Sequence, residues 1–272
     1  MTLADVAAAR SLLFVPGSRP DRFAKAAAAC ADLVVVDLED AVLPGEKAGA
    51  REAVTTWLNG PGSAAVRVNG TRSPELAADV AALVGAPGLL AVVVPMVEDP
   101  AALVAAHDRL GGAVPLVALV ETAIGVQRCS ELAGATGVAR LAFGHLDLSA
   151  DTGSALSDRA LLFARSTLVI ASAAARLPGP VEGVTTDVDD PSVAGAEALL
   201  ARELGFTGKF CVHPRQVEAV NTAFAPTQDE IDWAERVLQV GRAAGAVAVD
   251  GQMVDAPVIA RAESVMARGG RG

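Results

Sequence analysis

The 272-residue chain is predicted to fold as an α/β protein, a closed (β/α)8 TIM barrel with a C-terminal helical extension. Eight short runs rich in Val, Leu and Ala lack polar alternation, which is typical of parallel strands buried on both faces. A segment of helical length and composition follows each run. We therefore expect a barrel catalytic domain over residues 1–224. Residues 225–272 would form an extension that packs on the barrel and on a neighbouring subunit.

The apolar runs give the expected strands, which are Ser11–Val15, Leu33–Asp37, Ala65–Val68, Leu89–Val94, Val114–Val120, Leu141–Phe143, Val181–Gly183 and Lys209–Val212. The segments between them give the expected helices, which are Asp21–Cys30, Gly45–Trp57, Pro74–Val84, Pro100–Leu110, Thr122–Leu132, Asp158–Arg176, Pro191–Leu204 and Arg215–Ala223. A loop of Gly, Ser and Asp is expected after the sixth strand. The alternative is an open, doubly wound sheet, but neither GxGxxG nor GxxxxGK[ST] supports it.

The tail beyond the barrel contains two further expected helices, Thr227–Ala244 and Pro257–Arg268. The first is amphipathic, with one face made of Ile231, Ala234, Val237, Leu238 and Gly241. Because the tail is short, we expect it to lack a core of its own.

The composition restricts the class of partner and the compartment. A net charge of −10 and a pI near 4.8 argue against binding to nucleic acid or to an anionic membrane. The longest apolar run is too short to span a bilayer, and no signal peptide is expected. Cys30, Cys129 and Cys211 are widely spaced, so they predict small core residues in a reducing cytoplasm rather than a disulfide framework or a zinc site.

Two carboxylates follow consecutive buried strands. Glu121 comes directly after the fifth strand, and Asp147 lies four residues beyond the sixth. In α/β barrels the carboxyl ends of the strands surround the ligand site, and two acids there can share one Mg²⁺ ion. The alternative interpretation is that Glu121 caps the next helix and that Asp147 is a turn residue.

Arg67 lies within the third strand, where an inward-facing arginine is costly unless it is paired. It is predicted to hold a carboxylate or a developing oxyanion. A buried ion pair with Asp37 or Glu39 is the alternative.

A second acidic group, formed by Asp37, Glu39 and Asp40, follows the second strand. These carboxylates are expected either to support the metal site through its bound waters or to pair with Lys47 and Arg51 on the next helix.

Ser18 and three basic residues, Arg19, Arg22 and Lys25, lie near a helix start. This patch indicates a phosphorylated ligand tail such as that of coenzyme A, unless these are ordinary solvated charges.

The three histidines give weaker predictions. His107 is expected to face solvent in the middle of a helix, and His145 is expected in a loop near the site. His213 precedes a proline, and a structural role is favoured over a catalytic one.

Taken in order, several segments resemble the citrate lyase β-subunit-like proteins, which belong with the malyl-CoA and citramalyl-CoA lyases in the HpcH/HpaI aldolase group. The resemblance extends over about Arg10–Glu263 and is carried by RSLLFVPGSRPDRFAKA, VVVDLEDAVLPGEKAGAR, VRVNG, VVVPMVE, LVALVETAIGV, GHLDLSADTG, GKFCVHPRQV and GQMVDAPVIARAE.

The resemblance implies a Mg²⁺-dependent barrel lyase assembled as a homotrimer or a dimer of trimers. Glu121 and Asp147 match metal ligands that also contact the substrate. Arg67 matches the arginine on the substrate carboxylate or carbonyl. Asp255 matches an acid that reaches a neighbouring subunit's active site. Glu39 is the third candidate catalytic residue, with Arg67 and Asp255.

The resemblance also implies where coenzyme A binds. Phe14, Arg19 and Lys25 match positions that hold it, and Val212 and His213 match backbone contacts to the thioester. The implied reaction cleaves a 3-hydroxy-3-carboxyacyl-CoA to acetyl-CoA and a 2-oxoacid, or runs in reverse. A malate-synthase-like or thioesterase activity, the β subunit of a multi-subunit citrate lyase acting on a citryl-acyl carrier protein, and a non-catalytic scaffold subunit are the alternatives.

Overall fold

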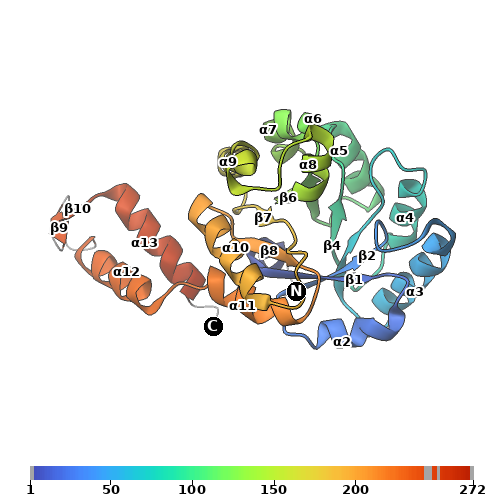
Figure 1. Ribbon diagram of the computed structural model, residues 1–272, viewed down its shortest axis with the longest axis horizontal. Coiled ribbons are helices and arrows are strands. Elements are labelled where there is room, and N and C mark those ends of the chain that lie inside the picture. Colours follow the sequence, from blue (N-terminus) through green and yellow to red (C-terminus); the bar gives the residue numbers. More distant parts are fainter. Residues whose placement is uncertain (1–2, 242–246, 250–251, 270–272) are drawn as a thin grey trace. The chain divides into compact units, whose positions relative to one another are not determined.

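The computed structural model describes residues 3–241, 247–249 and 252–269. Eight parallel strands close into a barrel in the order β1 to β8, with helices around the outside (Figure 1), which confirms the predicted (β/α)8 fold. The strands are β1 (Ser11–Pro16), β2 (Leu33–Asp37), β3 (Ala64–Arg67), β4 (Leu89–Val94), β5 (Leu116–Val120), β6 (Val138–Phe143), β7 (Val181–Glu182) and β8 (Gly208–Cys211).

Alternate residues of the strands point into the barrel and fill it with apolar side chains. Leu12, Val35, Val93, Leu119 and Phe210 belong to this interior cluster and are almost completely buried. Pairing of β1 with β8 closes the ring, with Leu12 opposite Phe210. The interior below the strand ends is therefore a packed core, and ligands can enter only at the mouth.

Most helices lie where the sequence predicts them. The helices of the first 221 residues are α1 (Leu3–Ala8), α2 (Phe23–Ala27), α3 (Lys47–Asn59), α4 (Leu76–Leu83), α5 (Pro100–Arg109), α6 (Ala123–Gln127), α7 (Cys129–Ala133), α8 (His145–Thr152), α9 (Asp158–Ala174), α10 (Pro191–Leu204) and α11 (Arg215–Phe224), the last of which ends just beyond residue 221. Short 3-10 turns at Pro20–Arg22 and Pro44–Glu46 precede α2 and α3.

Two local predictions differ from the structure, and the structure adds one helix. The segment after β6, expected to be a loop, forms α8, which ends at Gly153 in the left-handed conformation (φ 69°) that glycine adopts without strain. The single helix expected over Thr122–Leu132 is divided at Arg128 into α6 and α7. The N-terminal helix α1 was not predicted.

The chain divides into two compact units, Met1–Asn221 and Thr222–Gly272. The second contains α12 (Gln228–Gly241), the antiparallel hairpin of β9 (Val247–Val249) and β10 (Gln252–Val254), and α13 (Ala256–Gly269). Ala234 and Val237 of α12 pack with Ala262 and Val265 of α13. The expectation that this tail lacks a core of its own is therefore wrong. Among the residues described, no helix has the length and apolar character needed to cross a bilayer.

Candidate active site

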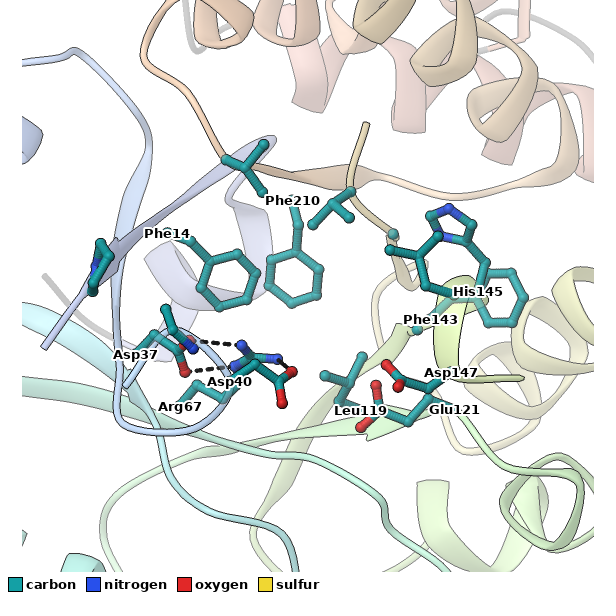
Figure 2. Close-up of a pocket in the computed structure, with 17 residues that line it drawn as sticks. Phe14, Asp37, Asp40, Arg67, Leu119, Glu121, Phe143, His145, Asp147 and Phe210 are labelled. Atoms are coloured by element: carbon teal, nitrogen blue, oxygen red, sulfur yellow. Dashed lines mark hydrogen bonds and ion pairs between the residues drawn. The ribbon is translucent and has the colours of Figure 1, made fainter. Parts of the chain in front are cut away.

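A cavity of ≈ 380 Å³ opens at the carboxyl ends of the barrel strands (Figure 2). Strands on opposite sides of the ring contribute to it, so the site is assembled from distant parts of the sequence. Its lining residues are Phe14, Pro16, Asp37, Asp40, Ala41, Arg67, Leu119, Glu121, Phe143, Gly144, His145, Leu146, Asp147, Gly183, Val184, Phe210 and Val212. The cavity thus combines a ring of aromatic and aliphatic side chains with four carboxylates and one guanidinium.

Glu121 is the buried acid of this cavity, with only 3% of the residue exposed. Its Oε1 accepts a hydrogen bond of 2.7 Å from the backbone N–H of Met96, a residue with φ of 52° in the left-handed region. Burial, reinforced by repulsion from Glu39 and Asp147, raises the pKa of Glu121 to about 9. The backbone therefore holds the side chain in place, in surroundings that disfavour its charged form.

Asp147 enters the same cavity from the first turn of α8. Figure 2 shows its carboxylate and that of Glu121 pointing into one part of the cavity. Gly144 makes this possible, because a Cβ at that position would lie 2.2 Å from Glu121 Oε2. The alternative interpretation of the pair is wrong: the side chain of Thr122, not Glu121, caps α6 by accepting from Gly125 N–H, and Asp147 is helical.

Arg67 faces the two acids from the other side of the cavity (Figure 2). Its Nε and Nη2 donate to the two oxygens of Asp37, both at 2.7 Å, and its Nη1 lies 3.0 Å from Glu39 Oε2. The guanidinium also lies 4.8 Å from the centre of the Phe14 ring. The bidentate pair fixes the plane of the guanidinium. Arg67 therefore forms the buried ion pair and also lines the cavity.

The three acids at the end of β2 all pair with Arg67. Asp37 receives the N–H groups of Glu39 and Ala41 in addition to the guanidinium, and Asp40 lies 3.3 Å from Arg67 Nη1. Burial raises the pKa of Glu39 to about 8, against the lowering effect of Arg67. Glu39 is not among the residues that line the cavity, and its catalytic role remains a prediction.

The alternative partners proposed for these acids are wrong. Lys47 donates to the carbonyls of Leu38 and Glu39 and to Asn69 Oδ1, rather than to a carboxylate of the group. Arg51 pairs with Glu75 and Asp79. Lys47 therefore shapes the backbone of the acidic segment, and Arg51 belongs to a separate cluster between α3 and α4.

The donor set of the cavity fits a hard divalent cation. Glu121 and Asp147 offer carboxylate oxygens. Burial, which raises the pKa of Glu121, disfavours its charged form, and a bound cation would offset that cost. In the described residues no group of three or more His, Cys, Asp and Glu side chains forms a metal site. Two protein ligands suit Mg²⁺, which keeps water or substrate in its other positions.

A second cavity of ≈ 670 Å³ lies between the ends of β1 and β8 and shares Phe14, Pro16 and Val212 with the first. Lys25, Arg22 and Arg215 give it positive charge, and His213 lines it. Four of the five predicted coenzyme A residues, Phe14, Lys25, Val212 and His213, meet here. Arg19 is not among the lining residues, and its guanidinium pairs with Asp21.

The histidines and cysteines take mainly structural positions. His213 Nδ1 accepts the N–H of Arg215 at 3.2 Å and so caps α11, as its predicted structural role implies. His107 is buried with Nδ1 3.0 Å from the Val114 carbonyl oxygen, so its predicted exposure is wrong. Cys129 and Cys211 are buried, and burial raises the pKa of each to about 12. Cys30 is exposed, contrary to the prediction.

His145 lines the cavity, which confirms its predicted position near the site, but it begins α8 instead of lying in a loop, and burial lowers its pKa. Three other residues that shape the site, Met96, Gly144 and Gln216, are not among the sequence predictions. Met96 contributes its backbone N–H, and Gly144 leaves space for the Glu121 side chain. Neither contribution can be recognised from the residue type. Gln216 had a usable signal, because a glutamine three residues after a helix cap is one half of a capping box.

Asp255 precedes α13 in the second unit. Its carboxylate accepts the N–H of Val258 at 3.3 Å, and its carbonyl accepts that of Ile259. The residue is half-buried and caps the helix. Its predicted action in a neighbouring subunit's active site remains a prediction.

Comparison with known families and proteins gives a consistent result. Residues 10–214 match the family described as HpcH/HpaI aldolase/citrate lyase. A citrate lyase subunit beta-like protein of Mycobacterium tuberculosis is 37% identical over 273 residues, covering 97% of both chains. A (3S)-malyl-CoA thioesterase of Cereibacter sphaeroides is 34% identical, covering 95% of this chain and 94% of its own.

Solved structures agree with these sequence matches. The crystal structure of the protein CitE of Mycobacterium tuberculosis in complex with magnesium, acetoacetate and coenzyme A superposes with a TM-score of 0.84. It is 35% identical in sequence, and the match covers 97% of this chain and all of the other.

Proposed function

Because the chain belongs to the HpcH/HpaI aldolase/citrate lyase family, we propose that it is a Mg²⁺-dependent carbon–carbon lyase. Its substrate would be a 3-hydroxy-3-carboxyacyl-CoA such as citramalyl-CoA or malyl-CoA, cleaved to acetyl-CoA and a 2-oxoacid, or formed from them. The observation that carries the proposal is the meeting of Glu121, Asp147 and Arg67 around one cavity that adjoins a basic groove.

The reaction breaks the bond between C2 and C3 of the acyl chain. The 3-hydroxyl loses its proton and becomes the keto group of the 2-oxoacid, while the acetyl-CoA enolate gains a proton at its methyl carbon. A divalent ion held by Glu121 and Asp147 would supply Lewis-acid stabilisation of the oxygen that carries the negative charge. The residues of the chain must then place the carboxylate, hold the thioester and move the proton.

Arg67 is suited to the first of these tasks. Its guanidinium is oriented by Asp37 before any ligand arrives, so no reorganisation is needed when charge develops nearby. Nη1 is shared by Glu39 and Asp40, at 3.0 and 3.3 Å, and a substrate carboxylate would compete with these weaker partners rather than with Asp37. Arg67 thus binds and orients the 2-oxoacid end of the substrate.

The groove between β1 and β8 suits the coenzyme A arm. Lys25 and Arg22 come from the start of α2 and the turn before it, and Phe14 and Val212 join the groove to the cavity. Exposed cations bind phosphate groups, and the shared apolar wall gives the pantetheine chain a path to the acids. This arrangement supports a free CoA ester as the substrate.

Proton transfer at the acetyl methyl carbon is assigned to Asp255 of a neighbouring chain in a homotrimer or hexamer, with Glu39 as a further candidate. Asp255→Ala should leave coenzyme A binding near normal and remove most of the turnover. A mixed oligomer of Asp255→Ala and Arg67→Ala chains should regain activity, since each site would draw on two chains. No recovery in the mixed oligomer would exclude the sharing of sites.

A thioesterase is the second candidate, favoured by relatives of Cereibacter sphaeroides that are named (3S)-malyl-CoA thioesterase. In that reaction water attacks the thioester carbonyl, and the C2–C3 bond stays intact. Both candidates would use the same cavity and groove.

One experiment separates the candidates. The purified protein is incubated with citramalyl-CoA or malyl-CoA and Mg²⁺, and 2-oxoacid and free thiol are followed in parallel. A lyase releases pyruvate or glyoxylate with acetyl-CoA and no free thiol. Free thiol with an intact hydroxyacid would identify the thioesterase, and no Mg²⁺-dependent product from any of these esters would refute both.

A further inference from the structure

Gln216 lies fully buried in the first turn of α11, and its amide group makes four hydrogen bonds to the backbone. Its Oε1 accepts the N–H groups of Val212 and His213, at 2.9 and 3.2 Å. Its Nε2 donates to the carbonyls of Thr185 and Asp187, at 3.0 and 2.9 Å. A glutamine amide has two donors and two acceptor sites, so the hydrogen-bonding capacity of this side chain is fully used.

These four backbone groups come from two different walls of the site. Val212 and His213 follow β8 and line the basic groove, and Val212 also lines the acidic cavity. Thr185 and Asp187 belong to the irregular segment between β7 and α10, next to Val184 of the cavity wall. A single side chain therefore joins the groove to the segment behind the cavity.

The hydrogen bonds also decide which backbone groups a ligand can use. The N–H groups of Val212 and His213 already donate to Gln216, and the His213 carbonyl accepts the N–H of Gln216 itself at 3.0 Å. A coenzyme A arm that lies against this edge would therefore meet the Val212 carbonyl, which can accept from an amide N–H of the pantetheine chain. The position of that carbonyl is set by Gln216.

The acidic part of the cavity has its own anchors. Gly183, which lines the cavity, donates its N–H to Glu182 Oε1 at 2.8 Å and accepts from Lys209 Nζ at 2.6 Å. Glu182 in turn pairs with Arg165. The wall at Gly183, which lies against His145, therefore has anchors besides Gln216.

We propose that Gln216 is a positioning residue for the coenzyme A arm of the substrate: it fixes the backbone at the end of β8 in the conformation that receives the pantetheine chain. This inference rests on the proposed function, because the groove has a role in catalysis only if the substrate is a CoA ester. Loss of Gln216 should weaken the binding of coenzyme A and leave the site of the 2-oxoacid intact.

The test compares Gln216→Met, which keeps the length and removes all four hydrogen bonds, with Thr207→Val as a matched control. Thr207 donates to the Gly179 carbonyl and accepts from Arg140 at the opposite end of the barrel, so this control also removes partly buried hydrogen bonds. Thermal midpoints of both variants are recorded, together with calorimetric titrations of coenzyme A and of pyruvate in the presence of Mg²⁺.

We expect Gln216→Met to raise the Kd for coenzyme A and the KM for the acyl-CoA about tenfold. Its kcat and its affinity for pyruvate should stay within about threefold of the wild type, and Thr207→Val should change neither binding constant. Equal coenzyme A affinity in the two variants would overturn the proposal. Failure of the wild-type protein to bind coenzyme A at all would instead refute the proposed function.

A measurement on the wild-type protein covers the case in which Gln216→Met does not fold. Amide hydrogen exchange is followed at Val212 and His213 before and after coenzyme A is added. Both amides should be protected in the free protein, because their partner is a buried side chain. Exchange as fast as that of an exposed loop before coenzyme A is added would contradict the proposal.

Discussion

The two sides of the barrel mouth are built by different means. The side of β2, β3, β5 and β6 carries buried charged groups. Arg67 binds Asp37 through two hydrogen bonds, and Glu121 is buried beside Asp147. On the side of β1 and β8, the charges belong to exposed residues such as Lys25, and backbone groups held by Gln216 form the wall.

This difference indicates a division of labour. Charges in a buried site interact strongly and are costly to leave unbalanced, so the acidic side suits the step in which charge develops. Exposed charges are screened by water and salt, so the side of β1 and β8 suits the binding of a long, flexible arm. The acidic side should therefore govern turnover, and the other side should govern affinity.

The largest expected effect is on the acidic side. Glu121→Gln should lower turnover by about 1,000-fold, because a metal ion contributes several kcal/mol of charge stabilisation to a transition state. The matched control is Asp151→Asn, an exposed acid near the same segment whose oxygen caps α6 through Ala123 N–H. If Glu121→Gln had the same kcat as this control, the acidic side would not govern turnover.

Arg67→Met should have the next largest effect, lowering kcat about 100-fold or more. It would also destabilise the protein by about 3–5 kcal/mol, since Asp37 would remain buried without its partner. Steady-state kinetics and urea unfolding measure the two effects. A change in KM for the acyl-CoA with kcat unchanged would place Arg67 functionally on the affinity side, contrary to this comparison.

A double variant separates the two consequences for Arg67. Asp37→Asn combined with Arg67→Met removes both charges of the pair, so stability should recover in part while kcat stays low. Recovery of kcat together with stability would show that Arg67 acts only through the fold.

The pH dependence of stability and of Mg²⁺ affinity should also distinguish the two sides, with smaller effects. The pKa of Glu39 is about 8 and that of Glu121 about 9, so both carboxyls hold protons at pH 7 that the unfolded chain has released. Stability of the metal-free protein should therefore fall as pH rises from about 4.5 towards 9. Affinity for Mg²⁺ should rise over pH 7–9, by up to about tenfold per pH unit for each proton released.

Thermal unfolding with and without Mg²⁺ at several pH values measures both trends. Coenzyme A affinity at constant ionic strength is the control, because the basic groove contains none of these acids. A Mg²⁺ affinity independent of pH over this range would contradict the raised pKa values that burial gives the two carboxyls.

The smallest effect is expected in the basic groove. Lys25→Ala should weaken coenzyme A binding about 2- to 5-fold, less at high salt, because the charge is exposed. Arg19→Ala should weaken it less, since Arg19 pairs with Asp21 and does not line the groove. If Arg19→Ala lost more coenzyme A affinity than Lys25→Ala, the phosphate groups would lie nearer to Arg19 than to the groove.

The sequence predicts the acidic side better than the other, for a physical reason. Acids at or shortly after the ends of consecutive buried strands favour a ligand site, so Glu121 and Asp147 could be located from their positions, and both line the cavity. The eight strands were likewise evident from apolar runs. Backbone groups carry no such signal: the N–H of Met96 and the space left by Gly144 depend on packing between strands distant in sequence.

The sequence predictions are wrong where local composition and tertiary packing disagree. The segment rich in Gly, Ser and Asp after β6 was expected to be a loop, yet it forms α8 and places Asp147 in a helical turn. His107, expected to be exposed, is buried against the carbonyl of Val114. The core of the C-terminal unit was missed because α12 and α13 supply facing apolar sides to each other.

The central claim is that Glu121 and Asp147 hold a single divalent ion, and titration calorimetry with Mg²⁺ in the presence of pyruvate tests it directly. The wild-type protein should bind one ion per chain and release protons, which is detected as a heat that varies with the ionisation enthalpy of the buffer. Glu121→Gln and Asp147→Asn should each abolish this binding. Binding of Mg²⁺ that is unchanged in both variants, or no binding to the wild-type protein at millimolar concentrations, would contradict the account.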